Sequence, residues 1–274
     1  MGGIDDAQSL KKTLRRFFIS PRRIKGAQGN CLVELDRNLA HHLRTVLRIG
    51  AGAKIVLFDG TGVEYLGEII SSTPSHVRVR LLEQSWPETE SSLEITLAQA
   101  LLKEQAFDRV LTSATELGVD RIVPVLSRRT VVKIHSAEAE KKLFRWRKIL
   151  EEASAQSGRV KPPEISHAVE FEKLLIQEFD GEKILLWEKA KGGELEELRK
   201  NQDQFIAKGK IMLLLGPEGG FEDEEAKKAM NAGFLPLGLG PRILRAETAP
   251  LVAIALVQYF FGDLKKAIAR TRFF

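Results

Sequence analysis

The sequence has few of the residues that build disulfide frameworks or metal sites. Its single cysteine is Cys31, which excludes an internal disulfide and any zinc site built from several cysteines. The five histidines show no His-x-x-x-His spacing, so we expect a site without metal. So little cysteine is typical of proteins of a reducing, cytoplasmic compartment.

Long hydrophobic runs are also missing. Residues 1–10 are polar and no apolar segment follows them, which argues against a secretory signal peptide. The longest uncharged apolar run, residues 248–262, is shorter than the ~18 residues that a membrane span needs. Hydrophobic residues make up 43% of the chain, so we expect a soluble globular protein with no membrane partner.

An acidic excess is absent too, and the positive charge lies in one segment. The net charge is +5. Residues 1–85 contain 13 Lys and Arg against 8 Asp and Glu, whereas residues 86–274 contain 29 of each. Such concentration favours a polyanionic partner of the first segment, although a basic domain without that partner explains the charge equally well.

Residues 15–85 show the pattern of a small strand-rich domain, after a tail that we expect to be flexible at residues 1–14. Arg78 and Arg80 alternate with Val77 and Val79, which predicts a half-buried strand with a basic outer face. The turn at residues 59–62 predicts a hairpin. The expected strands are Asn30–Leu35, Lys54–Phe58, Val63–Ile70 and His76–Leu81.

One helix is expected among these strands, over Asp36–Arg48. Its apolar stripe would be Leu39, Leu43, Val46 and Leu47. A basic stripe could contact RNA phosphates or be an ordinary solvated face, and it consists of Arg37, His41, Arg44 and Arg48.

Beyond a polar linker at residues 86–92, residues 93–274 alternate strand-like and helical runs, which predicts an α/β domain with a mostly parallel sheet. The expected strands are Glu94–Ala98, Arg121–Val125, Lys183–Trp187, Ile211–Leu215 and Phe234–Leu237. The expected helices are Glu104–Leu117, Ala137–Ser157, Phe171–Phe179, Glu222–Asn231 and Glu247–Phe261.

Two glycine-rich stretches follow strands about 20 residues apart: LLLGPEGGF at residues 213–221 and LGLGPRILRAETAP at residues 237–250. Loops at the carboxyl ends of parallel strands form ligand sites, so one shared pocket is more plausible than two unrelated turns. The first stretch lacks the Gly-Lys-Ser/Thr of a P-loop, and four acids at residues 222–225 would repel a phosphate. We therefore expect a ligand held by main-chain contacts, with a tight structural turn as the alternative.

The pair GPEGGF and LGLGPRILRAETAP resembles the SPOUT class of methyltransferases, and more narrowly the ribosomal RNA small subunit methyltransferase E family, which methylates N3 of a uridine in 16S rRNA. RRFF at residues 15–18, ATELGV at residues 114–119 and the stretch from Arg145-Trp146 to Gly158-Arg159 support the match, which runs over nearly the whole chain. One departure is Ser113, where relatives usually carry a lysine; Lys103 could replace it in contacting RNA.

The resemblance implies a PUA-like β-barrel, a trefoil-knotted α/β domain that forms a homodimer, S-adenosylmethionine as cofactor, and 16S rRNA of the small ribosomal subunit as partner. It implies cofactor contacts at Glu188, Leu215, Gly216, Pro217, Glu218, Gly219, Gly220, Leu237, Gly238, Leu239, Gly240, Ile243 and Leu244. Basic candidates for RNA binding are Arg16, Arg22, Arg23, His41, Arg44, Arg48 and Arg159.

Methylation at N3 of uracil requires removal of its proton and stabilisation of the resulting oxyanion. We hypothesise that Arg245 or Arg242 stabilises the uracil oxygens and that Glu247, or water held by it, accepts the proton; Glu247 could instead cap a helix. Two other functions remain open: a SPOUT ribose 2′-O-methyltransferase acting on tRNA or large-subunit rRNA, and a non-catalytic RNA-binding or assembly protein.

Overall fold

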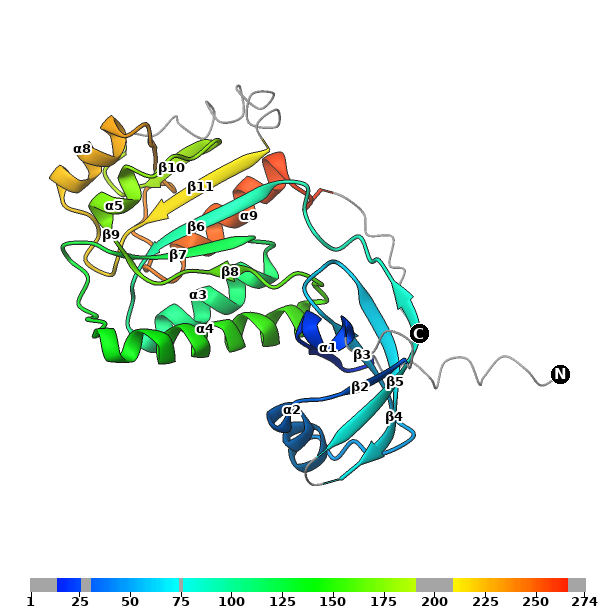
Figure 1. The fold of residues 1–274 in the computed structure, drawn as a ribbon. Coiled ribbons are helices and arrows are strands. Elements are labelled where there is room, and N and C mark those ends of the chain that lie inside the picture. Colours follow the sequence, from blue (N-terminus) through cyan, green and yellow to red (C-terminus); the bar gives the residue numbers. More distant parts are fainter. Residues whose placement is uncertain (1–13, 26–30, 74–75, 191–208, 266–274) are drawn as a thin grey trace. The chain divides into compact units, whose positions relative to one another are not determined.

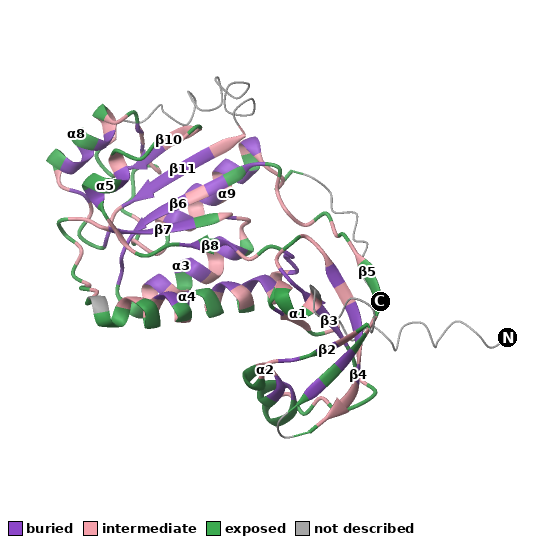
Figure 2. Ribbon diagram, in the orientation of Figure 1, coloured by how far each residue is buried: buried purple, intermediate pink, exposed green. Residues whose placement is uncertain are grey.

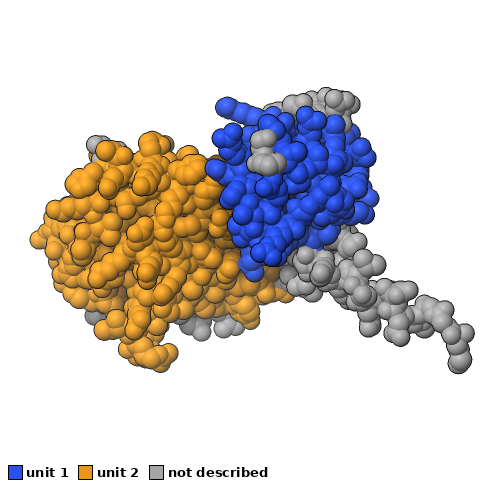
Figure 3. Space-filling model, turned by 90° about the horizontal axis from the view of Figure 1, so that it is seen from below, with its two compact units in different colours: residues 1–89, 154–161, 268–274 blue, residues 90–153, 162–267 orange. Residues whose placement is uncertain are grey.

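The structure is a computed structural model that describes residues 14–25, 31–73, 76–190 and 209–265. The expected tail, apart from Leu14, lies outside the described residues. The chain divides into two compact units (Figure 3): residues 1–89 with 154–161 and 268–274, and residues 90–153 with 162–267. No helix among the described residues is long and apolar enough to cross a membrane.

The first unit is built on a β-sheet. In the described residues it has five strands in the order β1-β3-β4-β5-β2, antiparallel except for β1 beside β3. Val77 and Val79 are fully buried while Arg78 and Arg80 are exposed, which confirms the expected basic outer face. The elements are β1 Arg16–Phe18, α1 Pro21–Lys25, β2 Leu32–Glu34, β3 Lys54–Phe58, β4 Glu64–Ser72 and β5 Val77–Ser85.

The single helix expected over residues 36–48 is wrong in its second half. A short α-helix, α2 (Arg37–His41), passes into a π-helix, η1 (His42–Val46). The wider π turn displaces the later residues around the axis, so Val46, expected in the apolar stripe, is 61% exposed while Leu43 is buried. The four residues of the expected basic stripe are all exposed.

The second unit confirms the expected α/β class. Its described strands form a seven-stranded parallel sheet ordered β12-β10-β11-β6-β7-β8, with β9 also paired to β7. The neighbouring strands β10, β11, β6 and β7 can be followed in Figure 1. The strands are β6 Glu94–Ala100, β7 Arg121–Leu126, β8 Glu164–Ile165, β9 Val169–Glu170, β10 Glu182–Leu186, β11 Lys210–Leu215 and β12 Leu235–Leu237. The helices are α3 Glu104–Glu116, α4 Ser136–Ser157, α5 Phe171–Leu175, α8 Asp223–Asn231 and α9 Ala249–Phe261.

The sheet of this unit is buried on both faces, which explains its continuous apolar strands (Figure 2). One face packs with residues of α3, α4 and α9, including Phe107, Trp146 and Ile254. The other packs with α5 and α8 through Phe171 and Ala226. The strand-to-helix loops at the carboxyl edge are thereby left to form a site.

Candidate functional site

Three neighbouring strands of the second unit end at the same level. Leu186 at the end of β10 pairs with Leu215 at the end of β11 and with Leu237 at the end of β12. The loops that follow enclose a pocket of about 300 Å³. It is lined by Leu186, Trp187, Glu188, Leu215, Gly216, Pro217, Glu218, Gly219, Gly220, Phe221, Leu237, Leu239, Gly240, Pro241, Arg242, Ile243, Leu244, Ala246 and Ala249.

The lining includes each expected cofactor residue except Gly238. Gly238 packs closely against Ala190 instead: a Cβ on Gly238 would lie 3.2 Å from the Ala190 carbonyl oxygen. Of the expected catalytic residues, Arg242 lines the pocket whereas Arg245 and Glu247 do not. Which residues contact a cofactor stays a prediction.

The first glycine loop, residues 216–221, is compact. Gly220 has φ +68°, a conformation that glycine adopts at little cost, and a Cβ there would lie 3.2 Å from the Glu188 carboxylate. A Cβ on Gly216 would meet the Gly220 backbone and the Phe221 ring at 3.3 Å. Glycine is therefore required here for close approach as well as for the turn.

Neighbouring strand ends hold this loop at three points. Gln99, fully buried on β6, donates through Nε2 to the Gly216 carbonyl (3.1 Å). The backbone N–H of Lys103 donates to the Glu218 carboxylate (2.9 Å), so Glu218, expected at the cofactor, has a structural contact as well. Arg129, in the loop after β7, donates through Nη1 to the Gly219 carbonyl (2.9 Å).

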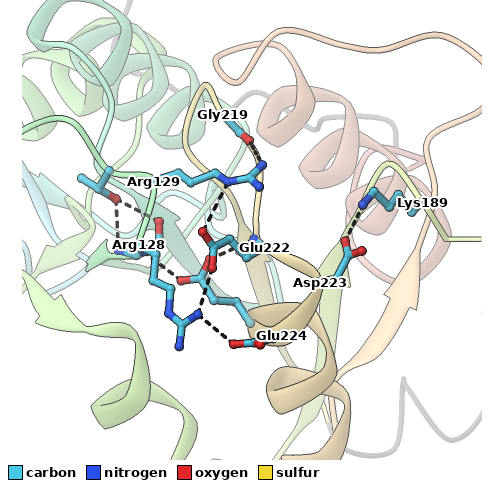
Figure 4. Close-up of polar contacts among 10 residues, drawn as sticks. Arg128, Arg129, Lys189, Gly219, Glu222, Asp223 and Glu224 are labelled. Atoms are coloured by element: carbon cyan, nitrogen blue, oxygen red, sulfur yellow. Dashed lines mark hydrogen bonds and ion pairs between the residues drawn. The ribbon is translucent and has the colours of Figure 1, made fainter.

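The acidic start of α8 is held by basic partners (Figure 4). Glu222 is the N-cap and forms a reciprocal capping box with the buried Glu225. Arg128 donates to Glu222 and Glu224 at 2.9 Å each, which raises the pKa of its guanidinium. The ion pair between Lys189 and Asp223 lowers the pKa of that carboxyl. These cations offset part of the negative charge of the four acids at residues 222–225, whose partners the sequence did not reveal.

The second glycine loop, residues 238–247, is more open. Ile243 is 90% exposed and Arg242 is also exposed. Helix α9 was expected to start at Glu247, but it begins at Ala249 with Thr248 as N-cap, so the half-buried Glu247 precedes the helix. The Arg245 carbonyl accepts hydrogen bonds from the N–H groups of Thr248 (2.8 Å) and Ala249 (3.0 Å), which fixes the start of α9.

Two expected RNA contacts occupy structural positions in the first unit. Arg16 forms a buried ion pair with Glu64, stacks over Phe58 at 5.3 Å, and donates to the Arg159 carbonyl at 3.0 Å. Arg159 itself is only 4% exposed, so its guanidinium is not displayed for an RNA contact. The sequence motifs around Arg16 and Arg159 could not distinguish a structural arginine from an RNA-binding one, because burial depends on contacts with residues far away in the sequence.

The other expected RNA contacts lie at the surface. Arg22, His41, Arg44 and Arg48 are exposed, and Arg23 is exposed while donating to the Glu34 carbonyl at 2.9 Å.

Sequence reasoning missed Gln99, Arg128 and Arg129, which lie outside the glycine motifs. The sequence marked them only by their place in the chain, because each lies shortly after a predicted parallel strand and therefore at the edge of the sheet where the loops meet.

Comparisons with known proteins agree with this architecture. The RNA methyltransferase domain family matches residues 89–258, and the RNA methyltransferase PUA domain family matches residues 35–82. A ribosomal RNA small subunit methyltransferase E from Bacillus subtilis is 31% identical over 221 residues, which is 80% of this chain and 86% of the relative.

Two solved structures with bound S-adenosylmethionine are similar over 92% of this chain and 99% of theirs, each at 32% identity. One is a methyltransferase from Legionella pneumophila (TM-score 0.81), and the other is a ribosomal RNA small subunit methyltransferase E from Neisseria gonorrhoeae (TM-score 0.78). Fold, pocket and matches define an RNA methyltransferase of SPOUT type with a PUA-like domain. Within that class, the chain belongs to the ribosomal RNA small subunit methyltransferase E family.

Proposed function

We propose that this protein transfers a methyl group from S-adenosylmethionine to N3 of a uridine in the 16S rRNA of the small ribosomal subunit. The observation that carries the proposal is the pocket between the two glycine loops, in a chain whose fold matches two S-adenosylmethionine-bound structures over 92% of its length.

The residues of the pocket fit this cofactor. A volume of about 300 Å³ lies at the lower end of the range for small-molecule sites. Close packing at Gly216 and Gly220 lets a ligand approach the main chain, and the exposed Glu188 carboxylate can accept hydrogen bonds from ribose hydroxyls. When bound, the cofactor supplies an electrophilic methyl group on its sulfonium.

The second glycine loop supplies the groups that uracil chemistry requires. Arg242 lines the pocket with an exposed guanidinium, which can donate to uracil oxygens as negative charge develops on them. Glu247 lies five residues further along the loop and is proposed to accept the N3 proton, directly or through water. Arg245 is a second candidate donor to the uracil oxygens.

The basic surface of the first unit is proposed to bind RNA phosphates. Its exposed members come from three separate elements, β5 with Arg78 and Arg80, the α2–η1 segment, and α1. A surface of this kind fixes the substrate's register without reading its bases. The contributing side chains from the last two elements are Arg22, Arg23, Arg37, His41 and Arg44, and Arg48 follows η1.

A homodimer in the cytoplasm completes the proposal. Tyr259 on α9 and Leu264 just beyond it are 52% and 51% exposed, and apolar side chains of this kind are covered at subunit interfaces. Light scattering should give twice the mass of the 274-residue chain, and a monomer at micromolar concentration would contradict the dimer. A ribosomal RNA substrate supports the cytoplasm as the proposed compartment.

The test uses methyl-labelled S-adenosylmethionine and small subunits that lack the modification, followed by digestion and mass spectrometry of the nucleosides. Labelled N3-methyluridine from 16S rRNA is expected. A 2′-O-methylated nucleoside would overturn the base assignment while keeping the enzyme class. No label and no cofactor binding would leave a non-catalytic RNA-binding protein.

A further inference from the structure

Two consecutive arginines in the loop after β7 have different partners. Residues 127–130 form a tight turn, in which the Thr130 N–H donates to the Ser127 carbonyl (3.1 Å) and the Ser127 N–H donates to the Thr130 hydroxyl (3.0 Å). Arg128 and Arg129 extend from this turn to opposite sides of the Glu222 carboxylate (Figure 4). Neither arginine lines the pocket.

Arg128 forms its hydrogen bonds with residues at the start of α8. Its guanidinium bonds to Glu222 and Glu224, and its backbone N–H donates to Glu225 at 2.9 Å. The backbone contact would survive any substitution of the side chain. Losing the guanidinium therefore removes two surface ion pairs but no hydrogen bond to the first glycine loop.

Arg129 contacts the loop itself. Its Nη1 donates to the Gly219 carbonyl at 2.9 Å, and its Cβ and Cδ lie 3.4 Å from where a Gly219 Cβ would be. Its Nε lies 3.8 Å from the Glu222 carboxylate, which keeps the guanidinium beside the loop. The guanidinium and the side-chain stem therefore both contact Gly219, and the ion pair with Glu222 holds them there.

That peptide is fixed at both ends. Arg129 holds the carbonyl of the Gly219–Gly220 peptide, and its N–H, on Gly220, donates to the Pro217 carbonyl at 2.9 Å. Fixing the plane of this peptide helps to hold Gly220 at its positive φ, in close contact with Glu188. Pre-organising a main-chain site before the ligand arrives reduces the entropy lost on binding.

We infer that Arg129 is a positioning residue for cofactor binding: it holds the first glycine loop in its binding shape without touching the cofactor. The inference rests on the proposed function, because it assumes that S-adenosylmethionine binds this loop. It assigns the neighbouring Arg128 no such role.

The test compares Arg129→Met with Arg128→Met, which remove the same guanidinium from adjacent residues and keep an aliphatic stem. Arg129→Met should raise the Kd and KM for S-adenosylmethionine about tenfold, as expected for losing a charged hydrogen bond, with kcat at saturating cofactor and KM for RNA within twofold of wild type. Arg128→Met should leave all four values within twofold. Arg129→Lys, which keeps a charged donor, should recover part of the affinity.

Unchanged cofactor affinity in Arg129→Met would overturn the inference, as would an equal loss in Arg128→Met, because the effect would then belong to the charge around α8. Melting temperatures of both variants separate a positioning effect from general destabilisation, since both arginines are half-exposed and their losses should cost similar stability. If the wild-type chain bound no S-adenosylmethionine, the proposed function itself would fail, which is a different result.

Discussion

The two glycine loops of the pocket are built in opposite ways. The first, residues 216–221, is tied to β6, α3 and the loop after β7 through Gln99, Lys103 and Arg129. The second, residues 238–247, displays its side chains, with Ile243 at 90% exposure. A Cβ on Gly220 would meet a carboxylate at 3.2 Å, whereas Gly240 has nothing within 4 Å.

This difference indicates a division of labour. A loop whose carbonyls are fixed by neighbouring elements presents a rigid main-chain surface, which suits a cofactor that is bound in the same way at every turnover. A loop with exposed arginines can meet a large substrate that arrives from solvent. We therefore expect substitutions that distort the first loop to change cofactor affinity, and substitutions of the exposed arginines of the second loop to change catalysis.

The largest effect is expected from Arg242→Met in the second loop. Loss of a donor to a developing oxyanion typically slows the chemical step by about 100-fold or more. Single-turnover methylation at saturating S-adenosylmethionine should show that loss, with cofactor Kd unchanged. Arg245→Met, whose side chain lies outside the pocket lining, is the matched comparison. A larger loss in Arg245→Met would transfer the oxyanion role to Arg245.

A smaller effect, on binding alone, is expected from Gly220→Val in the first loop. A β-branched residue at φ +68° is strained, and its side chain would meet Glu188. Calorimetry should give a cofactor Kd raised by about 30-fold. Gly240→Val meets the same backbone strain at φ +89° without a neighbour. If both variants lost equal affinity, the close packing at Gly220 would not matter.

Gln99→Met should have a more modest effect. It preserves side-chain volume but leaves the Gly216 carbonyl without its Nε2 donor, a loss of about 1 kcal/mol for one neutral hydrogen bond. We expect about a fivefold weaker cofactor Kd and a lower melting temperature. Unchanged cofactor affinity in a destabilised variant would show that Gln99 serves the sheet and not the loop.

The smallest effect concerns pH. Hydrogen bonding to Lys189 lowers the pKa of Asp223 from its ordinary 3.8, so the pair stabilises the fold above that value and the stabilisation is lost as pH falls through the lowered pKa. Asp223→Asn should melt slightly below wild type at pH 7, and the two curves should converge at the acidic end. A difference that grew on acidification would contradict this sign.

Much of the fold could be predicted from sequence because periodicity reports burial. Alternating Val77, Arg78, Val79 and Arg80 gave the strand β5 and its exposed face, and the apolar runs of the second unit gave its buried parallel strands. The spacing of the glycine motifs also predicted that their loops would meet, since parallel strands end at one edge.

What could not be predicted depends on tertiary partners. Val46 fits a helical stripe in sequence, but the π turn places it in solvent. Arg16 and Arg44 look alike in sequence, yet one is buried against Glu64 and the other is exposed. The anchors Gln99 and Arg129 lie more than 85 residues from the loop they hold, with no local motif to mark them.

The division of labour between the loops is tested most directly by titrating S-adenosylmethionine calorimetrically into the wild-type protein, Gly220→Val and Arg242→Met under identical conditions. The account predicts that Arg242→Met binds the cofactor as the wild type does and that Gly220→Val binds it far more weakly. Normal binding by Gly220→Val together with lost binding by Arg242→Met would contradict it.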